Sequence, residues 1–116
     1  MKEQLKYRTK TFAHNCIKLT EHLPNTYLGN HIKKQLIRSS TSVAANYRAT
    51  CIAQSKASFI AKISIVIEEI DESNFWIEFS LDEQLLPKEK TTFILKESLE
   101  LTSIFIASRK TASNNK

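Results

Sequence analysis

Histidines, cysteines and clustered carboxylates are the side chains of this chain that could hold a metal ion. His14 and Cys16 stand two residues apart, so their side chains would point in different directions on a helix. His22 and His31 flank a loop without carboxylates in register. The acids within residues 68–83 could line a di-iron site, but such sites pair Glu with His on facing helices, and no histidine follows His31. We therefore predict no metal site and no cofactor.

A pairing of Arg8 with His14 is the one arrangement that could act on a phosphodiester. Arginine can hold the anionic phosphate while histidine transfers a proton, and some all-helical ribonucleases use such a pair. The sequence offers no nucleophile–histidine pair, phosphate-binding glycine loop or paired catalytic carboxylates beside it. We predict a non-enzymatic protein, with ribonuclease activity as the minor alternative.

Positive charge is concentrated in the first half of the chain. The net charge is +5; residues 1–54 carry nine Lys and Arg against two acids, and residues 55–116 carry eight against ten. Such basic faces can bind the phosphates of RNA or DNA. The candidate nucleic-acid-binding residues are Lys10, Lys18, Lys34, Arg38 and Arg48. Alternatively, the basic half meets the acidic half of a neighbouring subunit, and the oligomer is purely structural or recruits proteins.

Helical periodicity runs through the whole chain of 116 residues, which contains one glycine. So few glycines argue against sheets joined by tight turns. Apolar residues recur every three or four positions in four segments, and both prolines fall between segments. The predicted helices cover about residues 3–22, 26–52, 55–86 and 87–109, with Asn25 or Thr26 and Ser55 as caps. We predict an all-α protein, an antiparallel up-down-up-down four-helix bundle over residues 1–110, followed by a fraying polar tail at 111–116.

The third and fourth predicted helices carry more apolar residues than one buried stripe requires. A monomeric bundle needs a single apolar face on each helix, and surplus apolar surface is unfavourable in water. We therefore predict a homo-oligomer in which Phe75, Trp76 and Phe79 lie at the interface between subunits.

The sequence also bears on the compartment. No apolar run is long enough to span a membrane, and the first twelve residues, MKEQLKYRTKTF, lack the apolar core of a signal peptide. Cys16 and Cys51 are not spaced as a redox or metal motif, which suits thiols in a reducing environment. We expect a cytoplasmic protein without a membrane partner.

Two segments, in the second and third predicted helices, resemble a known bacterial family. The first is NYRA at residues 46–49, within LPNTYLGNHIKKQLIRSSTSVAANYRAT, and the second is EEIDESNFW at residues 68–76. Together they resemble the four-helix-bundle proteins encoded in intervening sequences of large ribosomal RNA genes, and the resemblance covers about residues 10–108. Relatives include the accessory protein of diversity-generating retroelements, a basic pentamer that works with a reverse transcriptase and nucleic acid.

The resemblance implies a left-handed bundle that assembles into a ring, with a pentamer favoured, and a protein partner such as a reverse transcriptase. The residues that match the family's recurrent polar positions are Arg38, Ser42, Asn46 and Arg48. The chain departs from the family pattern at Ile52 and Gln54, where relatives usually carry basic residues. This departure lowers the positive charge near that helix end and weakens the expected attraction for nucleic acid there.

Overall fold

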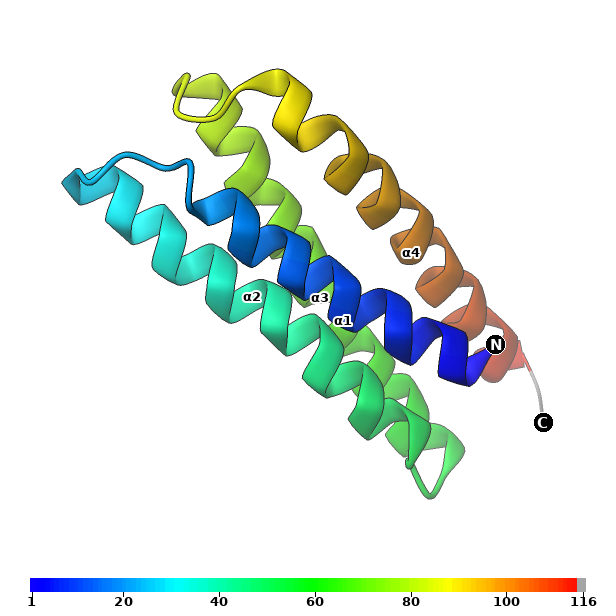
Figure 1. Ribbon diagram of the computed structural model, residues 1–116. Coiled ribbons are helices and arrows are strands. Elements are labelled where there is room, and N and C mark those ends of the chain that lie inside the picture. The colour runs from blue at the N-terminus through cyan, green and yellow to red at the C-terminus, as the bar shows by residue number, and fades with distance from the viewer. Residues whose placement is uncertain (115–116) are drawn as a thin grey trace.

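Four helices follow one another along the chain in the computed structural model, which describes residues 1–114 (Figure 1). They are α1 (Lys2–Thr20), α2 (Tyr27–Cys51), α3 (Lys56–Asp82) and α4 (Lys88–Asn114), and the described part of the chain contains no strand. The prediction of an all-α fold with four helices is confirmed. α4 continues past residue 110, and residues 115–116 of the predicted tail lie outside the described residues.

The helices form one elongated bundle that measures 50 × 22 × 21 Å. α2 and α3 share the most extensive contact, α1 packs on α2, α4 packs on α3, and α1 and α4 meet along the least extensive seam. The α1–α2 and α3–α4 loops lie at one end of the bundle, and the α2–α3 loop lies at the other end with both termini (Figure 1). Each helix therefore has two neighbours, and the core lies between all four.

Capping residues explain where α2 and α3 begin. Thr26 Oγ1 accepts a hydrogen bond from Gly29 N at 3.0 Å, and Ser55 Oγ accepts one from Ser58 N at 3.0 Å. Each hydroxyl satisfies an amide that has no carbonyl partner within the first helical turn. Both caps are among the residues that the sequence predicts for this role.

The end of α3 differs from the prediction, because the helix stops at Asp82 instead of about four residues later. Gln84 adopts the left-handed conformation, with φ of 59°. Leu85 N then donates a hydrogen bond to Ser80 O at 2.8 Å, and the turn closes over the helix end. Glycine usually occupies the position of Gln84 in such turns, so the sequence gives no warning of this one.

Small hydroxyl residues share the core with large apolar ones. Ser39 of α2 and Ser73 of α3 are both fully buried, and their Oγ atoms lie 2.9 Å apart in a hydrogen bond. Serine is short enough to let two helix backbones approach, and its buried hydroxyl costs little when it is bonded. Within residues 1–114, every buried side-chain nitrogen and oxygen has a hydrogen-bond partner.

Gly29 near the start of α2 provides a test of the loop geometry. An added Cβ would lie 2.0 Å from Pro24 O, far inside contact distance. A change from glycine to alanine within a helix otherwise stabilises by roughly 0.5–1 kcal/mol, so the clash reverses the expected sign. We predict that Gly29→Ala lowers the free energy of unfolding by about 1–3 kcal/mol, measured by urea titration with circular dichroism.

Lys33→Ala is the matched control, because Lys33 is exposed on the same helix. It should change the free energy of unfolding by less than about 0.5 kcal/mol. If Gly29→Ala were as stable as the wild type or more so, the close approach of the Pro24 carbonyl would not constrain this helix.

Candidate nucleic-acid interface

Basic residues of α1 and α2 meet at the surface between these two helices. Lys6 and Lys10 of α1 and Arg48 of α2 line a hollow of about 430 Å³, together with Glu3 and Tyr7. The four α1 residues share one edge of the helix because they are spaced by three or four positions. Glu3 is the only carboxylate among the lining residues, and its Oε2 lies 3.1 Å from Lys6 Nζ. The hollow therefore carries a positive surplus.

The unpaired cations of this hollow are Lys10 and Arg48. Both are exposed, and neither forms an ion pair with another residue of the described part of the chain. The sequence predicts both as nucleic-acid contacts, and the fold brings them together. Lys6 and Tyr7 were not among the predicted contacts, although their three- and four-residue spacing from Glu3 and Lys10 was visible in the sequence.

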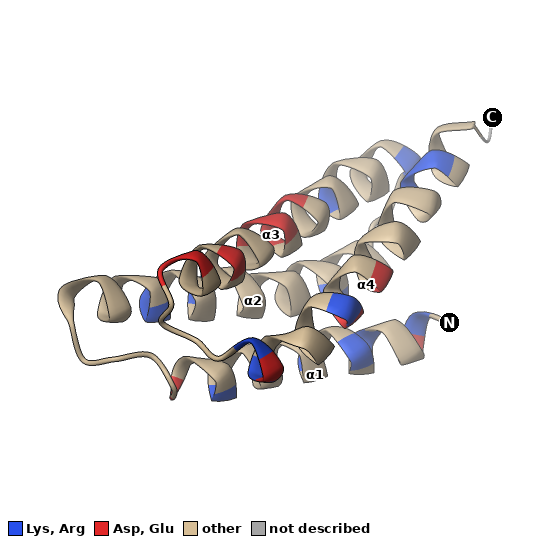
Figure 2. Cartoon of the chain, turned by 90° about the horizontal axis from the view of Figure 1, so that it is seen from above, with Lys and Arg blue, Asp and Glu red and all other residues tan. Residues whose placement is uncertain are grey.

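Two further predicted contacts lie elsewhere. Lys34 is exposed on α2, without an ion pair among residues 1–114. Lys18 lines a separate hollow of about 280 Å³ between α1 and α4, beside His22 and Lys90. Figure 2 shows Lys and Arg on α1, α2 and α4, whereas Asp and Glu gather along α3. The basic surface of α1 and α2 is therefore bordered by acids on its α3 side.

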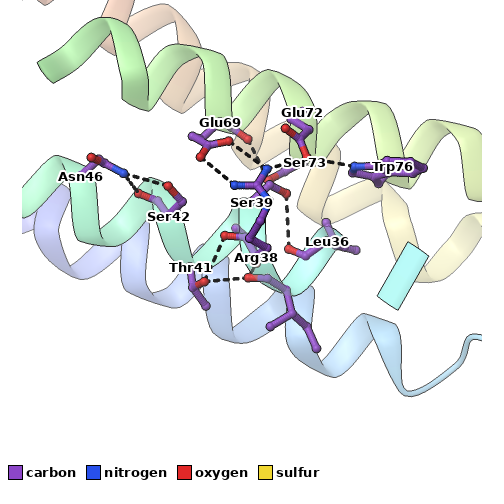
Figure 3. A network of polar contacts seen from close by, with 12 residues as sticks. Leu36, Arg38, Ser39, Thr41, Ser42, Asn46, Glu69, Glu72, Ser73 and Trp76 are labelled. Atoms are coloured by element: carbon purple, nitrogen blue, oxygen red, sulfur yellow. Dashed lines mark hydrogen bonds and ion pairs between the residues drawn. The ribbon is translucent and has the colours of Figure 1, made fainter. Parts of the chain in front are cut away.

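Arg38 belongs to a polar network between α2 and α3 (Figure 3). Its Nη1 donates a hydrogen bond to Glu69 Oε2 at 2.9 Å, and its Nη2 lies 2.6 Å from Glu72 Oε2. The sequence assigns Arg38 to nucleic acid or to an acid of a neighbouring subunit, but acids of its own chain hold it. The side chain of Arg38 remains 48% exposed, but Glu69 and Glu72 compensate its charge.

The same network changes the ionisation of Glu69. Hydrogen bonding from Arg38 is the main cause that lowers the pKa of this carboxyl group, and a hydrogen bond from Ser42 acts in the same direction. Partial burial opposes both, because it disfavours the charged form. Glu69 and Glu72 in turn raise the pKa of the Arg38 guanidinium. The pair is therefore charged on both sides near neutral pH.

Ser42 and Asn46 extend the network along α2. Asn46 Nδ2 donates hydrogen bonds to Ser42 Oγ at 2.8 Å and to Ser42 O at 2.9 Å. On α3, Trp76 Nε1 donates to Glu72 Oε2 at 3.2 Å (Figure 3). The α2 residues that reach residues 68–76 of α3 are therefore Arg38, Ser39 and Ser42, and Asn46 is linked to them within α2 through Ser42.

Phe75, Trp76 and Phe79, the predicted interface residues, form an aromatic cluster on α3. The ring centroid of Phe75 lies 4.9 Å from that of Trp76 and 5.7 Å from that of Phe79. Trp76 packs on the core and also contacts His31 of α2, at 5.4 Å between ring centroids. Phe79 is partly buried, whereas Phe75 is 50% exposed. Of the three, Phe75 offers a neighbouring subunit the most surface.

Arg8 lies at the α1–α4 seam and has carboxylate partners there. Its Nε donates to Glu97 Oε2 at 3.0 Å, and its Nη2 donates to Glu97 Oε1 at 2.7 Å and to Glu100 Oε1 at 3.0 Å. His14 is exposed and takes no part in this cluster. A guanidinium that already holds two carboxylates is not placed to bind a phosphodiester, so the geometry does not support the ribonuclease alternative.

The remaining chemistry-bearing groups do not assemble into a site in the described part of the chain. His, Cys, Asp and Glu side chains of residues 1–114 form no group that could hold a metal ion. Burial raises the pKa of the Cys16 thiol to about 12, so it stays protonated and unreactive. Among the four helices, none combines the length and apolarity needed to cross a membrane.

The fold and the α2–α3 network define a four-helix-bundle protein, and comparison with known proteins gives its family. Residues 3–107 match the family described as 23S rRNA-intervening sequence protein. A crystal structure from Bacteroides thetaiotaomicron, of a protein with unknown function from the S23 ribosomal protein family, is similar with a TM-score of 0.82. The two sequences are 30% identical over 95% of this chain and 99% of that one. No curated protein matches. The chain therefore belongs to the 23S rRNA-intervening sequence protein family.

The Arg38–Glu69 pair predicts a pH-dependent contribution to stability. Because folding lowers the pKa of Glu69, the carboxylate adds stability above the ordinary glutamate pKa of about 4.3, and this stability is lost as the pH falls through the lowered value. We expect Glu69→Gln to lower the free energy of unfolding by about 1 kcal/mol near neutral pH and by less near pH ~3, in urea titrations at both values.

Glu68→Gln is the control for this measurement, since Glu68 is exposed and has no ion pair within residues 1–114. It should leave stability nearly unchanged at both pH values. An effect of Glu69→Gln that has the same size in acid as at neutral pH would contradict an ionic contribution from this residue.

Proposed function

We propose that this chain is a non-enzymatic adaptor that associates with RNA or DNA through the basic surface of α1 and α2. The hollow lined by Lys6, Lys10 and Arg48 is the observation that carries the proposal. Cations in such an arrangement bind backbone phosphates without reading base sequence, and each contact releases counterions. Binding of this kind is weak and falls as the salt concentration rises, because one surface supplies only a few cations.

Lys34 extends the basic surface along α2. It stands fourteen positions before Arg48, which corresponds to about 21 Å of helix and can follow several phosphates. The acids of α3 repel a polyanion on the side of α2 that faces away from α1 (Figure 2). Membership of the 23S rRNA-intervening sequence protein family is consistent with an association with nucleic acid.

Assembly into a homo-oligomer of antiparallel bundles, with a pentamer favoured by the resemblance, is part of the proposal. Exposed apolar residues on α3 and α4 support it: Phe75 is 50%, Leu99 64% and Phe93 67% exposed. A second subunit would remove such side chains from water. Several copies of one weak basic surface would also raise the overall affinity through avidity. In this view the protein acts in the cytoplasm and presents nucleic acid to a partner such as a reverse transcriptase.

A purely structural or protein-recruiting oligomer is the second candidate function. Glu68, Asp71 and Glu78 are exposed on α3, and they could face the basic α1–α2 surface of a neighbouring subunit. Such a contact would compensate Lys10 and Arg48 in the assembly and leave them no role with nucleic acid.

The nucleic-acid proposal is tested by removing the two unpaired cations. We expect Lys10→Gln combined with Arg48→Gln to weaken binding of a fluorescently labelled RNA about tenfold at low salt. The slope of log affinity against log salt should fall by about two, because two phosphate contacts are lost. Anisotropy titrations at several salt concentrations measure both quantities.

Lys96→Gln combined with Lys110→Gln is the matched control, because it removes the same charge from exposed positions of α4. This double variant should bind the RNA with nearly the affinity of the wild type. Equal losses for both double variants would mean that net charge, and not the α1–α2 surface, governs binding. A wild type that binds neither RNA nor DNA at low salt would favour the structural oligomer.

The assembly proposal is tested at Phe75. We expect light scattering of the wild type at micromolar concentration to give the mass of an oligomer, and Phe75→Glu to shift it toward the monomer. An unpaired charge cannot be buried in an interface without a large cost. Phe75 is preferable to Trp76, whose replacement would also remove core packing and the contact with His31.

Tyr27→Glu is the control, since Tyr27 is 94% exposed at the start of α2. It should keep the mass of the wild type. A monomeric wild type would refute the assembly proposal, whatever the variants do.

A further inference from the structure

Tyr7 is an exposed aromatic residue that the core does not use. Tyr7 is 71% exposed, although tyrosine is a large and mostly apolar residue. The other tyrosine and phenylalanine rings of α1 and α2 differ among themselves: Phe12 is fully buried, Tyr47 packs on Phe105 at 5.5 Å between centroids, and Tyr27 is 94% exposed at the start of α2. Within residues 1–114, Tyr7 has neither a ring partner nor a side-chain hydrogen bond. Packing therefore gives no reason for this ring.

The surroundings of Tyr7 are cationic. The residue lines the same hollow as Lys6, Lys10 and Arg48, so Tyr7 and three cations border one space of about 430 Å³, together with Glu3, which pairs with Lys6. That volume falls within the range of about 300–1,000 Å³ that is usual for ligand sites. Proteins that bind single-stranded nucleic acid combine a basic groove for the backbone with aromatic rings on which bases stack. The hollow contains both components.

A duplex can contact the cations of this hollow but cannot stack a base on Tyr7. The base faces of a duplex are stacked on each other, so an aromatic ring on a protein surface can reach only backbone and groove edges. Neither α1 nor α2 can enter a groove of the duplex by itself, because the two helices pack side by side. Two packed helices of about 10 Å diameter each are wider together than the major groove, which measures about 12 Å. Duplex binding at this surface is limited to phosphate contacts.

We infer that the α1–α2 surface prefers single-stranded RNA or DNA, with an unpaired base stacked on Tyr7 and the adjacent phosphates held by Lys10 and Arg48. The inference rests on the proposed function and adds the class of nucleic acid and the residue that selects it. Stacking is tolerant of sequence because every base has a flat face, so the preference is for unpaired strands and not for a base sequence.

The test compares Tyr7→Leu with the wild type on a single-stranded RNA and on a duplex that contains the same strand. Leucine keeps an apolar side chain but removes the ring. We expect Tyr7→Leu to bind the single strand about tenfold more weakly, which is the loss of one stacked base. Its affinity for the duplex and its salt slope should stay as in the wild type, because no cation is removed. Tyr7→Trp should restore single-strand binding.

Tyr27→Leu serves as the matched control, because it removes an exposed tyrosine far from this hollow along α2. It should bind both nucleic acids as the wild type does, and circular dichroism confirms that each variant is folded. Single-strand binding by Tyr7→Leu at the wild-type level would overturn the inference and leave the proposed function standing, as would a wild type that binds the duplex equally well. A wild type that binds neither nucleic acid would overturn both.

Discussion

Arg38 binds Glu69 and Glu72 at the edge of the α2–α3 contact, while Ser39 meets Ser73 in its buried interior. The ion pairs bridge the two helices at their exposed edge, and the small hydroxyl residues let the backbones come close. α1 packs on α2 and α4 packs on α3, so the positions of α2 and α3 also affect where α1 and α4 lie. The basic surface exists because α2, placed in this way, presents its opposite edge to α1.

The side chains of the segment NYRA at residues 46–49 lie in different environments. Successive helical residues are rotated by about 100°, so neighbours in sequence face different directions. Tyr47 is buried and packs on Phe105, whereas Asn46 bonds to Ser42 on the edge that faces α3. Arg48 is exposed beside α1. In this chain Tyr47 therefore serves core packing, Asn46 serves a hydrogen bond along α2, and Arg48 supplies the exposed charge.

Sequence reasoning succeeded where the structure depends on neighbours along the chain. Helix positions follow from apolar periodicity, and the caps Thr26 and Ser55 act within one turn. It could not foresee the early end of α3, because Gln84 takes a conformation that usually marks glycine. Nor could it separate Arg38 from Arg48. Both are exposed arginines of α2, and only the packing of distant helices gives carboxylate partners to Arg38 and leaves Arg48 without an ion pair among residues 1–114.

The ion pairs of Arg8 close the bundle along its least extensive seam. A hollow of about 580 Å³ that Met1 and Ile104 help to line lies toward the chain termini, and the hollow beside Lys18 lies toward the other end, so α1 and α4 share less contact than the other neighbouring helices. Stability is consequently uneven within one fold. Local opening along this seam breaks the Arg8 ion pairs and the least extensive helix contact, whereas separation of α2 from α3 breaks the most extensive one. Amide hydrogen exchange along the α1–α4 seam therefore reports fluctuations that precede global unfolding.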